Sequence, residues 1–375
     1  MHRYAASFIV GLLMLLATPL TSGSQLTTAM HELGEVMIRL VPWAYQEEAN
    51  APPSIQGDID KLALLFSRSA GHFNEHPIGV KLNHDLLNEQ LQSLATNART
   101  YGSNSLRLML NDTFAQCMSC HSQDQVQRHS FSESQLRGLT NGFAKAELLF
   151  MTRDYSQALP QYLEYLKTTS PDSKSHSRLI AFERILVLAS LVNADFESAE
   201  DILHQAAELA SGSNEISLVN DWLKSLEEIG KGSMSPINAE QIRIEDLSRY
   251  IEVKWPAISD DSNWQRQQVY WVVFRRYLHL YISEHKHSID MPRLLYWLAM
   301  SDRSLQFKFY DGLSRLYLLE CITGYPDHPY AKRCFYEYEL LMVVSFSGSA
   351  GMTIPGDVQQ ELDALRKLIY PDQVK

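Results

Sequence analysis

The sequence predicts an all-α protein in which a four-helix bundle is followed by an array of α-helical hairpins. Apolar residues recur at three- and four-residue spacing through most of the 375-residue chain, which is typical of amphipathic helices. Short runs rich in Pro, Gly, Asn and Ser divide these segments into helix-sized lengths. A short motif also recurs in the second half, as expected where helical hairpins stack.

Four apolar stripes with near-heptad spacing lie within residues 25–128, and they predict the four helices of a bundle. The first helix is expected to end at Pro42, because proline removes a helical hydrogen bond and clashes with the preceding turn. The fourth is expected to carry its stripe into the bundle interior. In chain order the stripes are Leu26, Met30, Leu33, Met37 and Leu40; Ile59, Leu62, Phe66, Ala70 and Phe73; Leu87, Leu91, Leu94 and Ala98; and Leu106, Leu110, Phe114, Cys117 and His121.

The second half carries a repeated motif. The run at 154–158 (DYSQA) recurs in related form at 195–199 (DFESA), 41 residues later. Each copy offers a small residue for a helix crossing and an aromatic residue to fill the adjacent gap. This region resembles tetratricopeptide helical hairpins, with a period stretched from the usual ~34 residues. The resemblance predicts such hairpins over residues 135–230. A break at Gly230–Pro236 precedes a C-terminal helical domain, residues 237–375, that would continue the array.

Aromatic-rich segments predict the helices of the C-terminal domain. The aromatic residues Trp264, Trp271, Phe274, Tyr277 and Tyr281 include helical spacings, and we interpret this stripe as core packing rather than a binding face. The Gly/Ser-rich segment 345–355 is expected to be a loop. The predicted helices lie near residues 264–284, 291–300, 303–322, 329–345 and 357–370.

The run Cys117-Met118-Ser119-Cys120-His121 carries the chemistry of the chain. It is a Cys-x-x-Cys-His motif, the attachment sequence of a c-type haem. Two thiols three residues apart share one helix face, where they can form thioethers with the two vinyl groups of one porphyrin, and His121 can then bind the iron as the proximal ligand. No second Cys pair lies near the motif to complete a zinc site, and no βαβ pattern suggests a thioredoxin-like motif. The cofactor predicted is one covalent haem c.

The haem-bearing domain, residues 25–128, therefore resembles the cytochrome c′ family, and the resemblance covers roughly residues 25–125. The resemblance rests on the order of the four helices, on CMSCH near the end of the fourth, and on the first-helix run Ala29–Gly34. In low-spin members of that family a first-helix methionine is the second axial ligand, and the matching residue here is Met30. In high-spin members an apolar side chain closes the distal face and small gases bind. Other candidate distal ligands are Met37, His31, His72, His76 and His84.

The N-terminal segment 1–23 reads as a secretory signal peptide, with an apolar stretch Ser7–Ala17 that is short for a membrane span. Covalent haem of this type is attached outside the cytoplasm, so the signal and the motif together predict a periplasmic protein without a membrane span in its mature chain. In that compartment Cys321 and Cys334 can form a disulfide that joins two helices, the alternative being two separate buried thiols.

The net charge and the motifs of the chain exclude several classes of partner and function. The formal net charge is −11, or about −12 once Arg3 leaves with the signal, which argues against nucleic acid or an anionic membrane as partner. No phosphate loop or nucleophile signature points to an enzyme. We expect a periplasmic monohaem cytochrome that transfers single electrons and docks a redox or scaffold protein through its helical repeats. The alternatives are a gas- or redox-sensing haem adaptor with an open distal site, and a helical scaffold with structural haem. The sequence does not fix the oligomeric state.

Overall fold

The prediction of an all-α fold is confirmed by the computed structural model of the chain. Nearly all the residues it describes are helical. In the described ranges the strands β1 (Ser347–Gly348) and β2 (Gly351–Met352) form a short antiparallel hairpin, inside the segment expected to be a loop. The ranges that the structure describes are 22–46, 51–73, 76–123, 131–170, 177–192, 196–231, 242–258, 264–305, 312–348 and 351–371. The predicted signal segment lies outside them up to residue 21.

Four helices make up the N-terminal part. They are α2 (Ser22–Ala44), α3 (Ile55–Arg68), α4 (Ile78–Asn97) and α5 (Ser103–Gln123). Helix α2 packs against α3 and α5, and α4 packs against α3 and α5. A 3₁₀ turn (Ala70–Phe73) follows α3, where the sequence predicted more of the same helix.

The predicted end of the first helix at Pro42 is wrong, because α2 continues through this residue to Ala44. Val41, Trp43 and Ala44 are all buried around it. Burial of three apolar side chains contributes several kcal/mol at about 25 cal/mol per Å², enough to offset the loss of about 3 kcal/mol at an internal proline. Tertiary packing therefore extends the helix beyond its local stop signal.

The middle of the chain forms successive helices. Ala158 and Tyr162 of α8 and Ala199 of α10 are fully buried, as expected of residues at close helix crossings. Asp195 of the second motif copy lies outside the described residues. Gly230 and Lys231, which were expected to belong to the break, lie in α11, and the rest of the predicted break lies outside the described residues. The helices are α6 (Glu133–Leu136), α7 (Gly142–Met151), α8 (Tyr155–Thr168), α9 (Ser177–Val187) with a π-helical turn (Leu188–Val192), α10 (Phe196–Leu209) and α11 (Gly212–Lys231).

The C-terminal helices have a largely aromatic core. Trp271, Phe274, Tyr277 and Tyr281 are buried, which confirms that this stripe is core, whereas Trp264 at the start of the same helix is exposed. In the region where a helix was predicted near 303–322, α15 begins only at Leu313, and residues 303–305 belong to the preceding helix α14. The helices are α12 (Ile244–Ile258), α13 (Trp264–Glu284), α14 (Met291–Leu305), α15 (Leu313–Gly324), α16 (Pro329–Ser345) and α17 (Gly356–Ile369).

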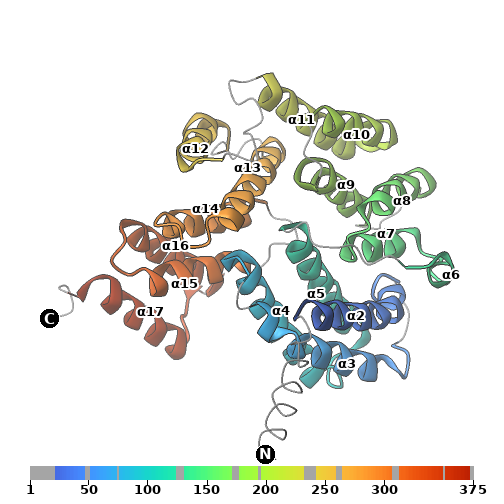
Figure 1. The fold of residues 1–375 in the computed structure, drawn as a ribbon, viewed down its shortest axis with the longest axis horizontal. Coiled ribbons are helices and arrows are strands. Elements are labelled where there is room, and N and C mark those ends of the chain that lie inside the picture. Colours follow the sequence, from blue (N-terminus) through green and yellow to red (C-terminus); the bar gives the residue numbers. More distant parts are fainter. Residues whose placement is uncertain are drawn as a thin grey trace, which may run out of the picture.

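The helical array curves back onto the N-terminal helices. Helix α7 packs against α2 and α5, and α15 packs against α4. At the second contact the Leu86 side chain lies 3.3 Å from the point where a Cβ on Gly312 would stand. The C-terminal end of α5 consequently lies in the middle of the molecule, with α7 and α8 on one side and α13 to α15 on the other (Figure 1).

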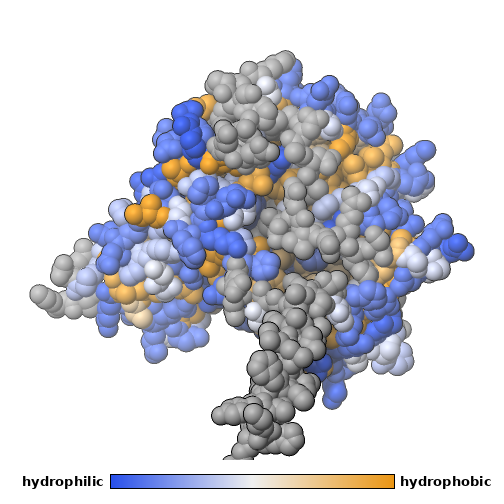
Figure 2. Space-filling view, in the orientation of Figure 1, coloured by the Kyte–Doolittle hydropathy of each residue, from blue (hydrophilic) through white to orange (hydrophobic). Residues whose placement is uncertain are grey.

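The surface is mainly polar on the face drawn in Figure 2, where hydrophilic residues cover most of the described area and hydrophobic ones form smaller bands. Within the described ranges, no helix combines the length and apolar character that a membrane crossing needs.

Cys321 near the end of α15 and Cys334 in the second turn of α16 form a disulfide, with Cα atoms 6.3 Å apart. Both residues are fully buried. The bond joins two consecutive helices across the turn between them. A covalent link of this kind suits the oxidising compartment that the sequence predicts.

Removing this disulfide should lower the free energy of unfolding. The bond closes a loop of 13 residues, for which the chain-entropy account gives a loss of about 3 kcal/mol. We expect Cys321→Ala combined with Cys334→Ala to shift the urea midpoint down, and the wild type to show the same shift after reduction. Equal midpoints for the oxidised wild type and the double variant would contradict this role.

Candidate functional site

The Cys-x-x-Cys-His motif occupies the last turns of α5. The stripe that precedes it is buried as expected, with Leu110 and Phe114 fully enclosed. Cys117 and Cys120 are half-buried thiols, whereas Met118 and Ser119 between them are fully buried. Because residues at i, i+3 and i+4 share a helix face, the two thiols and the His121 ring project from the same side of α5.

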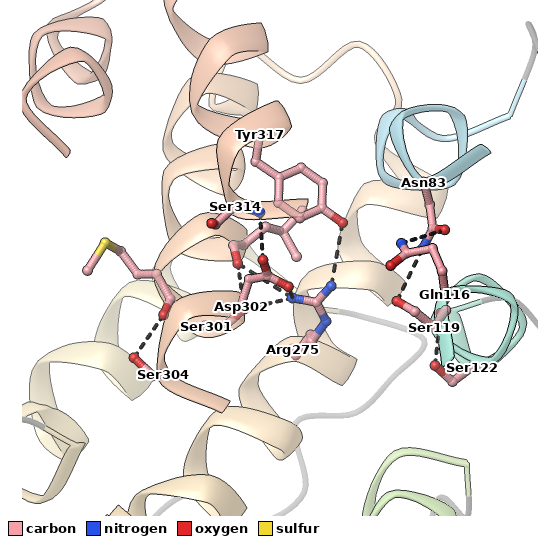
Figure 3. Close-up of polar contacts among 12 residues, drawn as sticks. Asn83, Gln116, Ser119, Ser122, Arg275, Ser301, Asp302, Ser304, Ser314 and Tyr317 are labelled. Atoms are coloured by element: carbon pink, nitrogen blue, oxygen red, sulfur yellow. Dashed lines mark hydrogen bonds and ion pairs between the residues drawn. The ribbon is translucent and has the colours of Figure 1, made fainter. Parts of the chain in front are cut away.

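The opposite side of the motif is fixed to α4 by buried polar contacts (Figure 3). The Asn83 amide donates to Ser119 Oγ at 3.1 Å, and Gln116 Nε2 donates to Asn83 Oδ1 at 2.9 Å. Ser122 Oγ donates to the Ser119 carbonyl at 2.9 Å. Because these bonds join buried side chains of α4 and α5, they fix the rotation of α5 about its axis and therefore the direction in which the thiols point.

His121 turns toward the α7–α8 hairpin. Its Nδ1 makes a short hydrogen bond with the Met151 carbonyl, and its own carbonyl accepts from the Tyr155 hydroxyl at 2.9 Å. A carbonyl only accepts, so Nδ1 carries the proton and Nε2 keeps its lone pair. Burial, with a smaller contribution from the Arg153 charge, lowers the pKa of His121 to about 3. The ring is therefore neutral at pH 7, the form that binds a metal ion.

The two thiols face different neighbours. Burial, with Cys120 close by, raises the pKa of Cys117 to about 12. The Cys117 sulfur acts electrostatically on Tyr45, which follows α2, and the Cys120 sulfur acts on Tyr155 of α8 and Tyr317 of α15. Residues at the end of α2 and in α4, α7, α8 and α15 thus surround the motif. The sequence placed it within the first four helices alone.

Tyr317 belongs to a buried polar cluster beside the motif (Figure 3). Arg275 of α13 lies 3.5 Å from the Tyr317 hydroxyl and 3.1 Å from Ser301 Oγ, and it is 3.9 Å from the Asp302 carboxylate. Burial raises the pKa of Tyr317 to about 12 although the Arg275 charge opposes it. The tyrosine is therefore protonated at neutral pH. This cluster joins α13, α14 and α15, and α15 in turn packs against α4.

A second buried cluster lies on the Tyr45 side. Glu147 of α7 is fully enclosed and accepts from Tyr45 at 2.8 Å, from Tyr162 at 2.5 Å and from Arg184 Nε at 2.9 Å. Burial first and the Glu147 charge second raise the pKa of both tyrosines well above its usual value, so both hydroxyls donate. One carboxylate thus joins α7, α8 and α9 to the end of α2.

The distal candidates from the sequence have varied surroundings. Met30 is half-buried against the hydrophobic core, and Met37 is buried. His84 is buried, with its ring stacked between Phe66 at 4.6 Å and Phe73 at 4.3 Å. His31 is exposed and His76 half-buried, while the His72 side chain lies outside the description. Met30 packs against the hydrophobic core, and the His121 ring bonds to the Met151 carbonyl. Neither contact joins these two proposed iron ligands to each other.

The residues present fit a covalent haem. Among the described residues, no group of three His, Cys, Asp or Glu is arranged to hold a bare metal ion. A haem iron takes four ligands from its porphyrin, so one imidazole and two thiols on one helix face form an adequate protein contribution. The carbonyl partner at Nδ1 is also the usual second contact of a metal-binding histidine.

Sequence reasoning missed Tyr45, Met151, Arg153, Tyr155 and Tyr317 as neighbours of the motif. Tyr155 belongs to the repeated motif at 154–158, which was interpreted only as hairpin packing, and Arg153 immediately precedes that motif. The positive φ of Arg153, 63°, marks the turn as special but is not visible in the sequence.

Comparison with known proteins returned no match: no protein-family model, curated protein or solved structure is significantly similar to this chain. The function is therefore argued from the chain's own residues.

Proposed function

We propose that this protein is a periplasmic monohaem c-type cytochrome that transfers single electrons. The observation that carries the proposal is the His121 ring, held by a hydrogen bond at Nδ1 and neutral at Nε2, beside two half-buried thiols one helical turn apart. Cys117 and Cys120 would hold haem c through thioethers, and His121 would be the proximal ligand. The bound haem supplies a one-electron couple that no side chain of the chain provides.

The chain's own residues orient and protect this site. Asn83 and Gln116 fix the face of α5, and Met151 fixes the imidazole ring. Because burial raises the pKa of the Cys117 thiol to about 12, it is a poor thiolate in the folded state. Haem attachment is therefore expected before the helices around α5 finish packing.

The proposed domain organisation follows the resemblances of the chain to the cytochrome c′ family and to tetratricopeptide hairpins. The packing of α2 to α5 around one another supports a bundle of the cytochrome c′ type, and the successive helices from α7 onward support a tetratricopeptide-like array that docks a protein partner. The net charge of −11 favours a basic redox partner over nucleic acid or an anionic membrane. The protein acts in this proposal as an electron carrier rather than as an enzyme with its own substrate.

A haem-based sensor is the second candidate. One observation favours it: the motif contacts α8 and interacts with α15, helices that belong to different parts of the curved array. A change at the iron could then alter how the array packs on α4 and α5. In this candidate the distal site is open to small gases, whereas in the first it is filled by Met30.

The absorption spectrum of the purified periplasmic protein separates these candidates. Electron transfer predicts a six-coordinate, low-spin haem with a weak methionine–iron band in the oxidised near-infrared. Sensing predicts a five-coordinate haem that binds CO. A protein without haem would refute both.

Replacing Met30 by leucine tests the distal ligand. The volume is nearly conserved, so the free energy of unfolding should change by less than about 1.5 kcal/mol. Loss of the thioether should convert the spectrum to high-spin and permit CO binding. Met37→Leu is the matched control, one heptad further along the same helix. An unchanged Met30→Leu spectrum together with an altered Met37→Leu spectrum would move the ligand to Met37. If neither variant alters the spectrum, the distal site is open or held by another residue.

A further inference from the structure

The turn between α7 and α8 holds His121 at two points. The Met151 carbonyl, at the end of α7, bonds to Nδ1 of the ring. The Tyr155 hydroxyl, at the start of α8, donates to the His121 carbonyl at 2.9 Å. Arg153 stands midway between these two contacts in the chain. The turn therefore fixes both the ring and the backbone of the proposed proximal ligand.

The turn itself is rigidly built. Its backbone amides bond to the end of α7, at 3.0 Å from Arg153 N to the Phe150 carbonyl and 2.9 Å from Asp154 N to the Leu149 carbonyl. The buried Asp154 carboxylate accepts from Ser156 at 2.8 Å and from Gln157 at 2.5 Å. With both its oxygens engaged, Asp154 keeps the turn closed.

Arg153 occupies an unfavourable position in this turn. Its φ of 63° places a residue with a Cβ in the left-handed region, where glycine is preferred. Its Nε is buried without a hydrogen-bond partner, and its side chain forms no ion pair within the described part of the chain. Backbone strain and an unpartnered buried donor together are typical of a functional position rather than of one optimised for stability.

We infer that Arg153 is a positioning residue that places a fixed positive charge on the proximal side of the haem and raises its reduction potential. This inference rests on the proposed function. A cation near the iron opposes the additional positive charge of the oxidised state, so it favours the reduced one. One electron enters from the redox partner and no proton moves at Arg153, since the guanidinium stays protonated.

The test is the reduction potential of the haem-loaded protein, measured by spectroscopic titration, in four variants. Arg153→Gln removes the charge and Arg153→Lys keeps it, both with a side chain in the left-handed position. Arg153→Gly removes the charge and also relieves the backbone strain of the left-handed conformation. Arg243→Gln removes an exposed charge just before α12 and is the matched control.

We expect Arg153→Gln and Arg153→Gly to lower the ratio of reduced to oxidised haem about tenfold at a given potential, a shift of about 59 mV for one electron. Arg153→Lys and Arg243→Gln should shift that ratio less than twofold. The melting temperature of the haem-free protein gives an independent readout, and it should rise in Arg153→Gly but not in Arg153→Gln.

Equal potentials for Arg153→Gln and Arg243→Gln would overturn the inference, as would equal losses in Arg153→Lys and Arg153→Gln. Failure of the proposed function is distinguishable from both, because the wild type would then carry no covalent haem at all.

Discussion

Replacing Cys117 and Cys120 together by alanine is expected to abolish covalent haem retention completely. Each thiol supplies one thioether, so either single variant should keep the haem through the other bond, in lower yield. The double variant has no covalent tether, and haem held only by His121 leaves on denaturation. Haem staining of denaturing gels, with protein from a host that matures c-type cytochromes, measures the effect.

The matched control removes the other two cysteines. Cys321→Ala with Cys334→Ala deletes the α15–α16 disulfide but leaves the motif on α5 intact. Its haem stain per molecule should equal that of the wild type even though its stability falls. If the control loses haem as fully as the double variant of the motif, haem loss reflects unfolding rather than missing thioethers.

Replacing Glu147 by alanine is expected to lower the free energy of unfolding by about 3–5 kcal/mol, the usual loss when one partner of a buried ion pair is removed. The Arg184 guanidinium would lose its principal buried counter-ion, and the hydroxyls of Tyr45 and Tyr162 would lose their acceptor. Urea unfolding followed by circular dichroism measures this change in the haem-free protein, where no cofactor contributes to stability.

An exposed pair provides the comparison. Glu133 is 87% exposed and lies 3.5 Å from Arg137 on α6, so Glu133→Ala should change stability by less than about 1 kcal/mol. A loss in Glu147→Ala no greater than in Glu133→Ala would show that the buried cluster is not what joins α2 to the hairpins. Replacing Glu147 and Arg184 together by leucine and methionine should recover part of the loss, because no charge then stays buried.

The helical class and many helix bounds could be predicted because amphipathic periodicity is local. The predictions of helices at 264–284 and 329–345 agree with α13 and α16, and Pro329 gives α16 a strong signal at its start. Pro42 was misjudged because its effect depends on the packing of Val41 and Trp43, which the sequence pattern around it does not reveal.

The sequence predicted how the site residues are arranged on α5, but not which residues of other helices surround them. The spacing of Cys117, Cys120 and His121 determines which helix face they share, and this requires no knowledge of the rest of the chain. Met151 and Tyr317 approach from helices more than 25 residues away because the array curves back onto α4 and α5. Such long-range contacts follow from the packing angles of many helix pairs, and no local pattern encodes them.

The central claim is that one haem is covalently bound to Cys117 and Cys120. Mass spectrometry of the denatured protein, purified from the periplasm of a host able to mature c-type cytochromes, tests it most directly. The account predicts that the intact mass exceeds the polypeptide mass by one haem, and that the proteolytic peptide containing both cysteines carries the whole increment. A polypeptide of unmodified mass, with both thiols alkylated by iodoacetamide, would contradict the account.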